Sequence, residues 1–346
     1  MRFTRQQGLW TYDAPVAAPP LAAVLEVSGA ILEWTVDEPA TTPRITLTDV
    51  EAADWLWRLV GTDAHVELVE AATGSVEATV DREVLEPLRR LALGHWMRRW
   101  WPASARDGIA ALEPSVLDAE LAVLTAAAEE FLAEATFDSD VDALLAGAGA
   151  PPLHLRDDPR VVALLEACAE VGELPLTAKA PTWRADFALV AGADGRPASD
   201  AIASGVSSIS WSAVPPGVFD AAEDTVTWSV AGSDEIPTEV VARVQAALAD
   251  PAEGHLLVPG IAVRLQCGQL AAAGELDEGG RAMLPLRLAE SAAWNLDWAS
   301  TQVHIGAAAG ESREARQRVR RFVRSRQAAP PPDAFLAELL ALDADY

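Results

Sequence analysis

The spacing of apolar residues changes twice along the chain, and this change is the strongest constraint on its fold. Residues 1–80 contain short runs rich in Val, Ile and Leu, which indicate extended segments. Residues 81–172 place apolar side chains three and four positions apart, as helices do, and the later spacing is strand-like again. The pattern predicts an α+β domain, a linker, a sandwich-like domain and C-terminal helices, at 1–174, 175–181, 182–306 and 307–346.

The first 80 residues are predicted to form a mixed region of short strands, one helix and a hairpin. Thr48–Glu51 has the capping-box spacing that begins a helix, which Gly61 then ends. Residues 65–70 and 76–80 alternate apolar and polar side chains, which predicts a hairpin with one polar face. Two more extended segments, on either side of a Ser-Gly turn, are 21–27 and 30–36.

Four segments between residues 81 and 172 have helical spacing, and two of them carry start signals. Asp158 precedes Pro159, which is the arrangement of an N-cap followed by the first helical residue. Ser115 with Asp118 marks a second helix start. These helices form either a bundle or a cap on the N-terminal sheet. Their predicted ranges are 82–100, 116–133, 139–147 and 159–171.

The region after the linker is predicted to be an all-β domain of about seven strands, because turn residues separate short extended segments. Residues 238–247 could instead be a helix capped by Thr238, but their valines and strand neighbours favour a strand. An Arg-rich helix over 311–327 follows, and Asp333 caps a final acidic helix. The seven segments are 183–190, 206–212, 225–231, 238–247, 261–270, 281–288 and 301–306.

Charge is distributed very unevenly along the chain. The whole sequence has a net charge of -26, whereas the stretch from Arg313 to Arg326 holds seven arginines and one glutamate. That stretch is therefore +6 and the rest of the chain -32. A second group, without intervening acidic residues, comprises Arg89, Arg90, Arg98, Arg99 and Arg106. We expect an acidic surface with two basic islands.

The C-terminal arginines fall at helical spacing and predict a docked helix with guanidinium groups facing outward. Its apolar side would be Ala315, Val319, Phe322 and Val323. This surface suits an acidic protein partner, and the alternative is that the arginines pair with carboxylates of the same chain. Nucleic acid is a less favoured partner, because the remaining charge repels phosphate. The candidate partner-binding residues are Arg313, Arg316, Arg320, Arg324, Arg98 and Arg99.

Arg98 and Arg99 lie in a segment that interleaves aromatic and basic residues, from His95 to Pro102. Such a combination occurs where nucleic-acid bases stack, and also where a helix end enters a core. Trp96 and Trp100 are four residues apart and would share one buried face. The arginines beside them could then cap the last carbonyls of the helix. We favour this structural interpretation.

The sequence contains no recognisable catalytic, metal-binding or nucleotide-binding motif. Its five histidines are scattered, and GxSxG, GxGxxG and GxxxxGK are all absent. We therefore expect a non-enzymatic interaction or scaffold protein without cofactor or metal. The alternative is a hydrolase-like site in a cleft between the domains, where His154, Arg156 and Asp157 lie just before the linker.

The expected compartment is the cytoplasm. No apolar segment near Met1 has the form of a secretion signal, and the longest uncharged run, 201–219, contains serines and a Pro-Pro-Gly turn. Cys168 and Cys267 lie far apart without metal-ligand spacing, as buried thiols do in a reducing compartment. We expect no membrane association.

Overall fold

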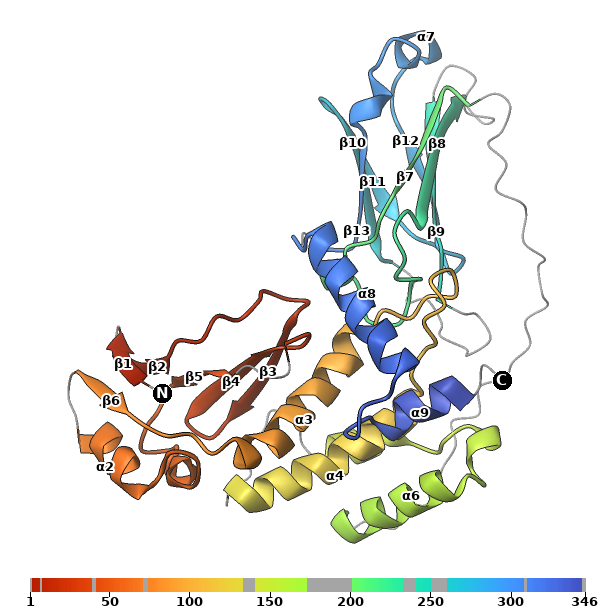
Figure 1. Ribbon diagram of the computed structural model, residues 1–346. Coiled ribbons are helices and arrows are strands. Elements are labelled where there is room, and N and C mark those ends of the chain that lie inside the picture. The colour runs from red at the N-terminus through yellow and green to blue at the C-terminus, as the bar shows by residue number, and fades with distance from the viewer. Residues whose placement is uncertain are drawn as a thin grey trace. The chain divides into compact units, whose positions relative to one another are not determined.

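Figure 1 shows the computed structural model, in which the chain divides into two compact units. Unit 1 comprises Met1–Trp101, Leu112–Pro181 and Glu314–Tyr346, and unit 2 comprises Pro102–Ala111 and Thr182–Arg313. The predicted linker at 175–181 and the predicted strand at 183–190 lie outside the described residues. The structure describes residues 2–6, 8–38, 42–70, 74–132, 141–172, 201–232, 240–249, 260–307 and 310–343.

Unit 1 begins with a six-stranded antiparallel sheet in the order β3-β4-β5-β2-β1-β6. Gly29 turns the chain between β3 and β4 with a φ of 71°, and a Cβ there would lie 2.1 Å from the Asp49 carbonyl oxygen. The strands predicted at 21–27 and 30–36 are thereby confirmed. The strands are β1 (Arg2–Gln6), β2 (Leu9–Tyr12), β3 (Ala22–Val27), β4 (Ala30–Thr35), β5 (Arg44–Leu47) and β6 (Ser75–Glu77).

One face of this sheet forms a core. Side chains alternate along each strand, so that Leu32, Ile45 and Leu47 are fully buried while Thr46 between the last two is partly exposed. Trp10 and Phe3 continue the buried face on β2 and β1. Helix α3 (Arg82–Trp100) packs against β3. The sheet is therefore buried on one side, as its alternating sequence predicts.

The hairpin predicted at 65–70 and 76–80 is only half present. Residues 65–70 belong to helix α2 (Thr62–Glu70), and β6 pairs with β1 instead. Leu68 is the one fully buried residue of α2, and Val66 and Val69 are exposed. The alternation was too short to separate a strand from a helix that buries one position, so the strand prediction was wrong.

The helix predicted to begin at Thr48–Glu51 starts later than expected. The Asp49 carboxylate accepts the backbone N–H groups of Glu51 and Ala52, which forms a turn rather than a first helical turn. Helical structure follows at η1 (Asp54–Leu56) and α1 (Trp57–Val60). Gly61 ends α1 with a φ of 83°, as its position predicts.

The helical region matches its prediction closely. The Asp158 carboxylate accepts the N–H of Arg160 and caps α6, with Pro159 as the first helical residue. Ser115 is not a cap, because α4 begins at Pro114 and the Ser115 hydroxyl donates to the Glu113 carboxylate. Helix α4 lies against α3, α5 and α6. These helices are α3 (Arg82–Trp100), α4 (Pro114–Leu132), α5 (Val141–Ala148) and α6 (Pro159–Val171).

Unit 2 contains two antiparallel sheets, in the orders β12-β9-β8-β7 and β11-β10-β13. Their inward side chains form one apolar cluster, to which β8 contributes Val230, β9 Ala242 and β10 Leu265. Two short elements, η3 (Trp211–Ala213) and α7 (Glu290–Ala293), lie between strands. The strands are β7 (Ala203–Ser207), β8 (Val226–Gly232), β9 (Val240–Ala246), β10 (Ala262–Cys267), β11 (Leu270–Glu275), β12 (Arg281–Pro285) and β13 (Gln302–Ile305).

The described part of the ambiguous segment 238–247 forms strand β9 over Val240–Ala246, as favoured from its valines. The prediction for 261–270 merged β10 with a turn at Gly268, and it missed strand β11. The small residues of β11, LAAAGE, lack the β-branched side chains that mark strands. The strand predicted at 206–212 lies earlier, as β7 at Ala203–Ser207, and Trp211 lies in η3 instead.

Residues 102–111 leave the helical region and pack in unit 2. Ser104 and Ile109 pair across a short turn, and the Ala103 carbonyl accepts the N–H of Ala221. The Arg106 guanidinium donates to the carbonyl oxygens of Glu223 and Asp224, both at 3.1 Å. One arginine of the second cluster is therefore used to fix a loop.

Candidate interaction site on the arginine helix

The arginine-rich segment forms helix α8 (Arg313–Ala328), as predicted. Val319 and Val323 are completely buried, and Phe322 packs edge-on against Trp96 with the ring centroids 5.6 Å apart. The apolar side of α8 therefore faces inward. This packing fixes which arginines can reach solvent.

Two of the arginines predicted to face outward are buried. Arg316 and Arg320 are 8% and 4% exposed, whereas Arg313 and Arg324 are exposed. Positions 316 and 320 lie three or four residues from Val319 and Val323, so they share part of the helix face that packs inward. The middle of the predicted arginine stripe therefore lies on the buried flank of α8, and only its two ends, Arg313 and Arg324, are exposed.

The outermost line of α8 consists of Gln317, Arg321 and Arg324, which are spaced by four and three residues and are all exposed. We call these three residues the α8 ridge. Among the described residues, no carboxylate pairs with Arg321. In a chain with 52 acidic residues, an exposed arginine that pairs with no described carboxylate differs from Arg318 and Arg326 of the same helix.

Ion pairs hold α8 from two sides. Arg318 donates to both carboxylate oxygens of Asp37, at 2.7 and 2.8 Å, and to Glu38 at 3.2 Å. These hydrogen bonds, above all those to Asp37, raise the pKa of Arg318 above its usual value. Near the other end, Arg326 donates to both oxygens of Glu338 at 2.7 and 2.6 Å. The helix is thus fixed to the sheet region and to the following helix.

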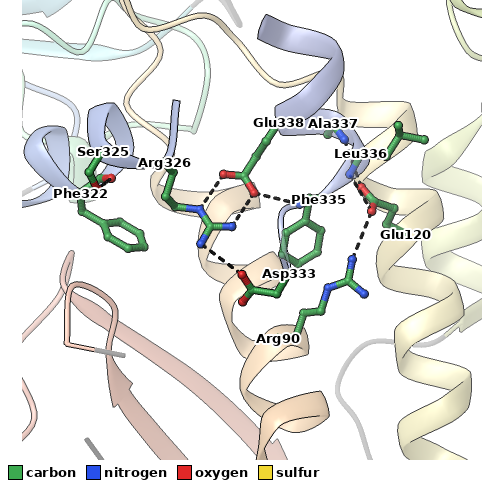
Figure 2. A network of polar contacts seen from close by, with 10 residues as sticks. All are labelled: Arg90, Glu120, Phe322, Ser325, Arg326, Asp333, Phe335, Leu336, Ala337 and Glu338. Atoms are coloured by element: carbon green, nitrogen blue, oxygen red, sulfur yellow. Dashed lines mark hydrogen bonds and ion pairs between the residues drawn. The ribbon is translucent and has the colours of Figure 1, made fainter. Parts of the chain in front are cut away.

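The contact between Arg326 and Glu338 is the centre of a buried network, shown in Figure 2. Both side chains are at most 8% exposed. Glu338 also accepts the N–H of Phe335 at 2.9 Å, and Asp333 lies 4.0 Å from Arg326. Because each oxygen of Glu338 has a donor, the buried charge is fully compensated.

A carboxylate from α4 binds the start of helix α9 (Leu336–Asp343). Glu120 accepts the backbone N–H groups of Leu336 at 2.8 Å and Ala337 at 3.2 Å, and Arg90 lies 3.6 Å away (Figure 2). Burial raises the pKa of Glu120 despite these contacts. Asp333 was predicted to cap this helix, but α9 begins three residues later and the capping group comes from α4.

Phe335 anchors the same segment and is completely buried. The Arg90 guanidinium stacks over its ring at 5.0 Å. A Cβ at Gly94 of α3 would lie 2.9 Å from the Phe335 ring and 2.5 Å from the Leu121 side chain. The glycine therefore makes the space that the aromatic ring occupies.

The second arginine cluster is also used internally. Arg98 binds both oxygens of Asp118, at 2.9 and 3.1 Å, and does not cap the carbonyls of α3 as predicted. Burial raises the pKa of Asp118 more than Arg98 lowers it. Arg99 stacks over Trp100 at 4.4 Å. Trp96 is buried as predicted, and its indole N–H donates to the Pro20 carbonyl.

His95 lies next to these groups on α3, and its pKa is strongly lowered. Burial, and secondarily the positive charge of Arg98, lower its pKa to about 4. The imidazole is therefore neutral at physiological pH.

The residues of the alternative catalytic site lie on one turn of unit 1. His154 and Asp157 are both exposed on the turn before α6. Arg156 donates to the Pro151 carbonyl, and Asp158 is occupied by its cap and its ion pair with Arg160. Nothing in this turn orients a general base toward a second reactive group.

In the described part of the chain, no three His, Cys, Asp or Glu side chains gather as metal ligands. Nor does any described helix combine the length and apolarity needed to cross a membrane. Comparisons with protein-family models, curated proteins and solved structures found no match to this chain.

Sequence reasoning found α8 but missed the residues that hold it. Glu120 and Leu336 are 216 positions apart, so no local pattern links them. Arg326 and Glu338 are 12 apart and separated by three prolines, which hides their pairing. The sequence contained one weak signal for the start of α9. Phe335 and Glu338 are three residues apart, which is the spacing between the first residue of a capping box and the glutamate that accepts its backbone N–H.

Proposed function

We propose that this protein is a non-enzymatic interaction protein that binds an acidic protein partner through the α8 ridge. The observation that carries the proposal is Arg321, which is exposed and has no carboxylate partner among the described residues of a strongly acidic chain. Arg324 extends the same surface, and Arg313 is exposed at the helix start. Arg316 and Arg320 support α8 from its buried side.

The ion pairs of α8 favour this role because they fix the helix before any partner arrives. Arg318 and Arg326 hold α8 on two sides, so binding does not have to order the backbone. Exposed charges each contribute only about 0.2–1 kcal/mol to affinity. We therefore expect the ridge to guide orientation and association rate, with further contacts on the partner providing most of the affinity.

Arg98 and Arg99 enter this proposal only as supporting residues, because one binds Asp118 and the other stacks on Trp100. A cytoplasmic location belongs to the same proposal. Both cysteines are free and buried, which suits a reducing compartment.

The test is affinity purification from the native host with wild-type protein beside R321E/R324E. The matched control is R82E/R287E, which makes the same charge change at two exposed arginines outside α8. We expect a stoichiometric acidic protein with wild type and control and its loss with R321E/R324E, while circular dichroism shows all three folded. Equal recovery of that protein by R321E/R324E would refute the α8 ridge as its binding site.

The captured protein must then bind in purified form. Titration of wild type and R321E/R324E against it should give a weaker affinity and a smaller salt dependence for the variant, because two of the attractive charges have been reversed. An unchanged salt dependence would contradict an electrostatic contact at the ridge.

A further inference from the structure

The segment that contains α9 lies against side chains from three other helices of unit 1. We call residues 333–343 the tail, and Arg90, Gly94, Glu120, Leu121 and Arg326 the cradle. All of these residues belong to unit 1, on α3, α4, α8 and the tail itself. Figure 2 shows Arg90, Glu120 and Arg326 of the cradle around Phe335, Leu336 and Glu338 of the tail.

The cradle recognises three different features of the tail. Gly94 and Leu121 accept the Phe335 ring, with Arg90 stacked on it. Arg326 binds the Glu338 carboxylate through two hydrogen bonds. A groove that binds a helix requires three features, which are an aromatic anchor, a bidentate charged pair and an acceptor for the free backbone N–H groups.

The third feature is the helix start itself. Glu120 accepts the N–H groups of Leu336 and Ala337, which have no acceptor within α9. Together these contacts recognise a phenylalanine at a helix start that is followed three residues later by a glutamate. The chemistry is specific to that pattern, because an unmatched partner would leave the Arg326 charge buried and unpaired and would leave Arg90 as the remaining partner of Glu120.

None of these recognition contacts involves the connection between α8 and the tail. The hydrogen bonds of that connection are local, from Ala329 N–H to the Ser325 carbonyl and from Ala334 N–H to the Pro331 carbonyl. The covalent link therefore supplies proximity, which raises the effective concentration of the tail. Recognition itself resides in the cradle and the tail.

We propose that the cradle also binds the tail in trans, so that a second copy of this chain can exchange residues 333–343 with the first. In a reciprocal exchange, every contact of Phe335, Glu338 and Glu120 is kept. Only the path of the connection between α8 and the tail differs. The proposal is independent of the α8 ridge, because no ridge side chain contributes to the cradle. It defines a second interaction surface whose occupant is the same segment of another copy.

The test uses the full chain with a site-specific protease sequence in place of Pro330–Pro332. After cleavage, a fluorescein-labelled peptide of residues 333–343 is titrated into the nicked protein and followed by anisotropy. We expect saturable binding with a Kd of about 10 µM or tighter. The same peptide should not bind intact protein at these concentrations, because the attached tail competes.

Variant peptides identify the site. We expect F335A to weaken binding at least about a hundredfold and E338Q at least about tenfold, since each removes a buried contact. The matched control, D343N, alters an exposed pair and should change binding less than about fivefold. Absence of binding, or equal binding of the F335A and wild-type peptides, would overturn the cradle as a recognition site.

Exchange between copies is tested on intact protein by co-expressing two differently tagged chains. We expect one tag to retrieve the other, and retrieval to fall when both chains carry F335A. If the peptide binds nicked protein but the tagged chains never co-purify, the second copy is not the occupant and the proposal is wrong in that respect.

Discussion

The two ends of α9 are held by ion pairs of nearly equal length in very different surroundings. At the start, Arg326 and Glu338 are 2.6 Å apart with side chains 8% and 5% exposed. At the end, Arg160 and Asp343 are 2.7 Å apart with side chains 43% and 62% exposed. Distance alone would make these contacts equivalent. Burial makes the first one strongly dependent on both partners and the second one weak.

The same contrast applies to the arginines of α8. Those near Val319 and Val323 are enclosed, while Arg321 and Arg324 on the ridge remain in solvent. A reversed charge should therefore affect folding on one side of the helix and association on the other.

The largest effect is expected from E338Q. The substitution leaves the buried Arg326 with Asp333, 4.0 Å away and partly exposed, as its counter-charge, which should lower the free energy of unfolding by about 3–5 kcal/mol. Urea denaturation followed by tryptophan fluorescence measures it, since Trp96 lies in the same unit. A loss below about 1 kcal/mol would mean that the Arg326 site is hydrated, contrary to its burial.

The next effect depends on pH and concerns His95. Its pKa of about 4 lies below the ordinary value of 6.5, so the unfolded chain takes up a proton first as pH falls. The stability present above pH 6.5 should decrease between pH 6.5 and 4, by about 2–3 kcal/mol in all. H95Q should lack this part of the pH dependence. Parallel stability curves for wild type and H95Q over this range would contradict the burial of the imidazole.

An intermediate effect is expected from R98Q, because Asp118 is buried while Arg98 is half exposed. Removing the guanidinium should cost about 1–3 kcal/mol at pH 7. The pKa of Asp118 is already raised by burial, so lowering the pH protonates this carboxyl in the folded state before it does so in the unfolded chain. The cost of R98Q should therefore shrink in acid. A cost that grows as pH falls would disprove this account of Asp118.

The smallest effect is expected from D343N, which makes the same acid-to-amide change as E338Q at the other end of α9. Loss of the exposed pair with Arg160 should change the free energy of unfolding by less than about 1 kcal/mol. Added salt should reduce the difference further. The comparison fails if D343N and E338Q cost the same under identical denaturation conditions.

The sequence was a good guide where structure is decided locally. The limits of α3, the Asp158 cap of α6 and the strand at β9 follow from patterns within a few residues. The sequence was a poor guide where the pattern of a short segment fitted both a strand and a helix, as in α2. It was also a poor guide where small residues form a strand, as in β11.

The candidate site was predictable only in part. Helical spacing identified α8 and its apolar face, yet it placed Arg316 and Arg320 in solvent because charged residues are normally exposed. Their burial depends on neighbours from distant parts of the chain. The Glu120 contact to α9 likewise requires the fold, since the acceptor and the helix start are far apart in sequence.

Some arginines of α8 are buried and others are exposed to solvent. Limited phenylglyoxal modification followed by mass spectrometry measures this difference residue by residue. In the native protein, Arg321 should react first and Arg324 soon after, while Arg316, Arg320 and Arg326 stay protected until the chain is unfolded. Equal reaction of Arg316, Arg320 and Arg321 in the native protein would contradict the orientation of the helix and the ridge derived from it.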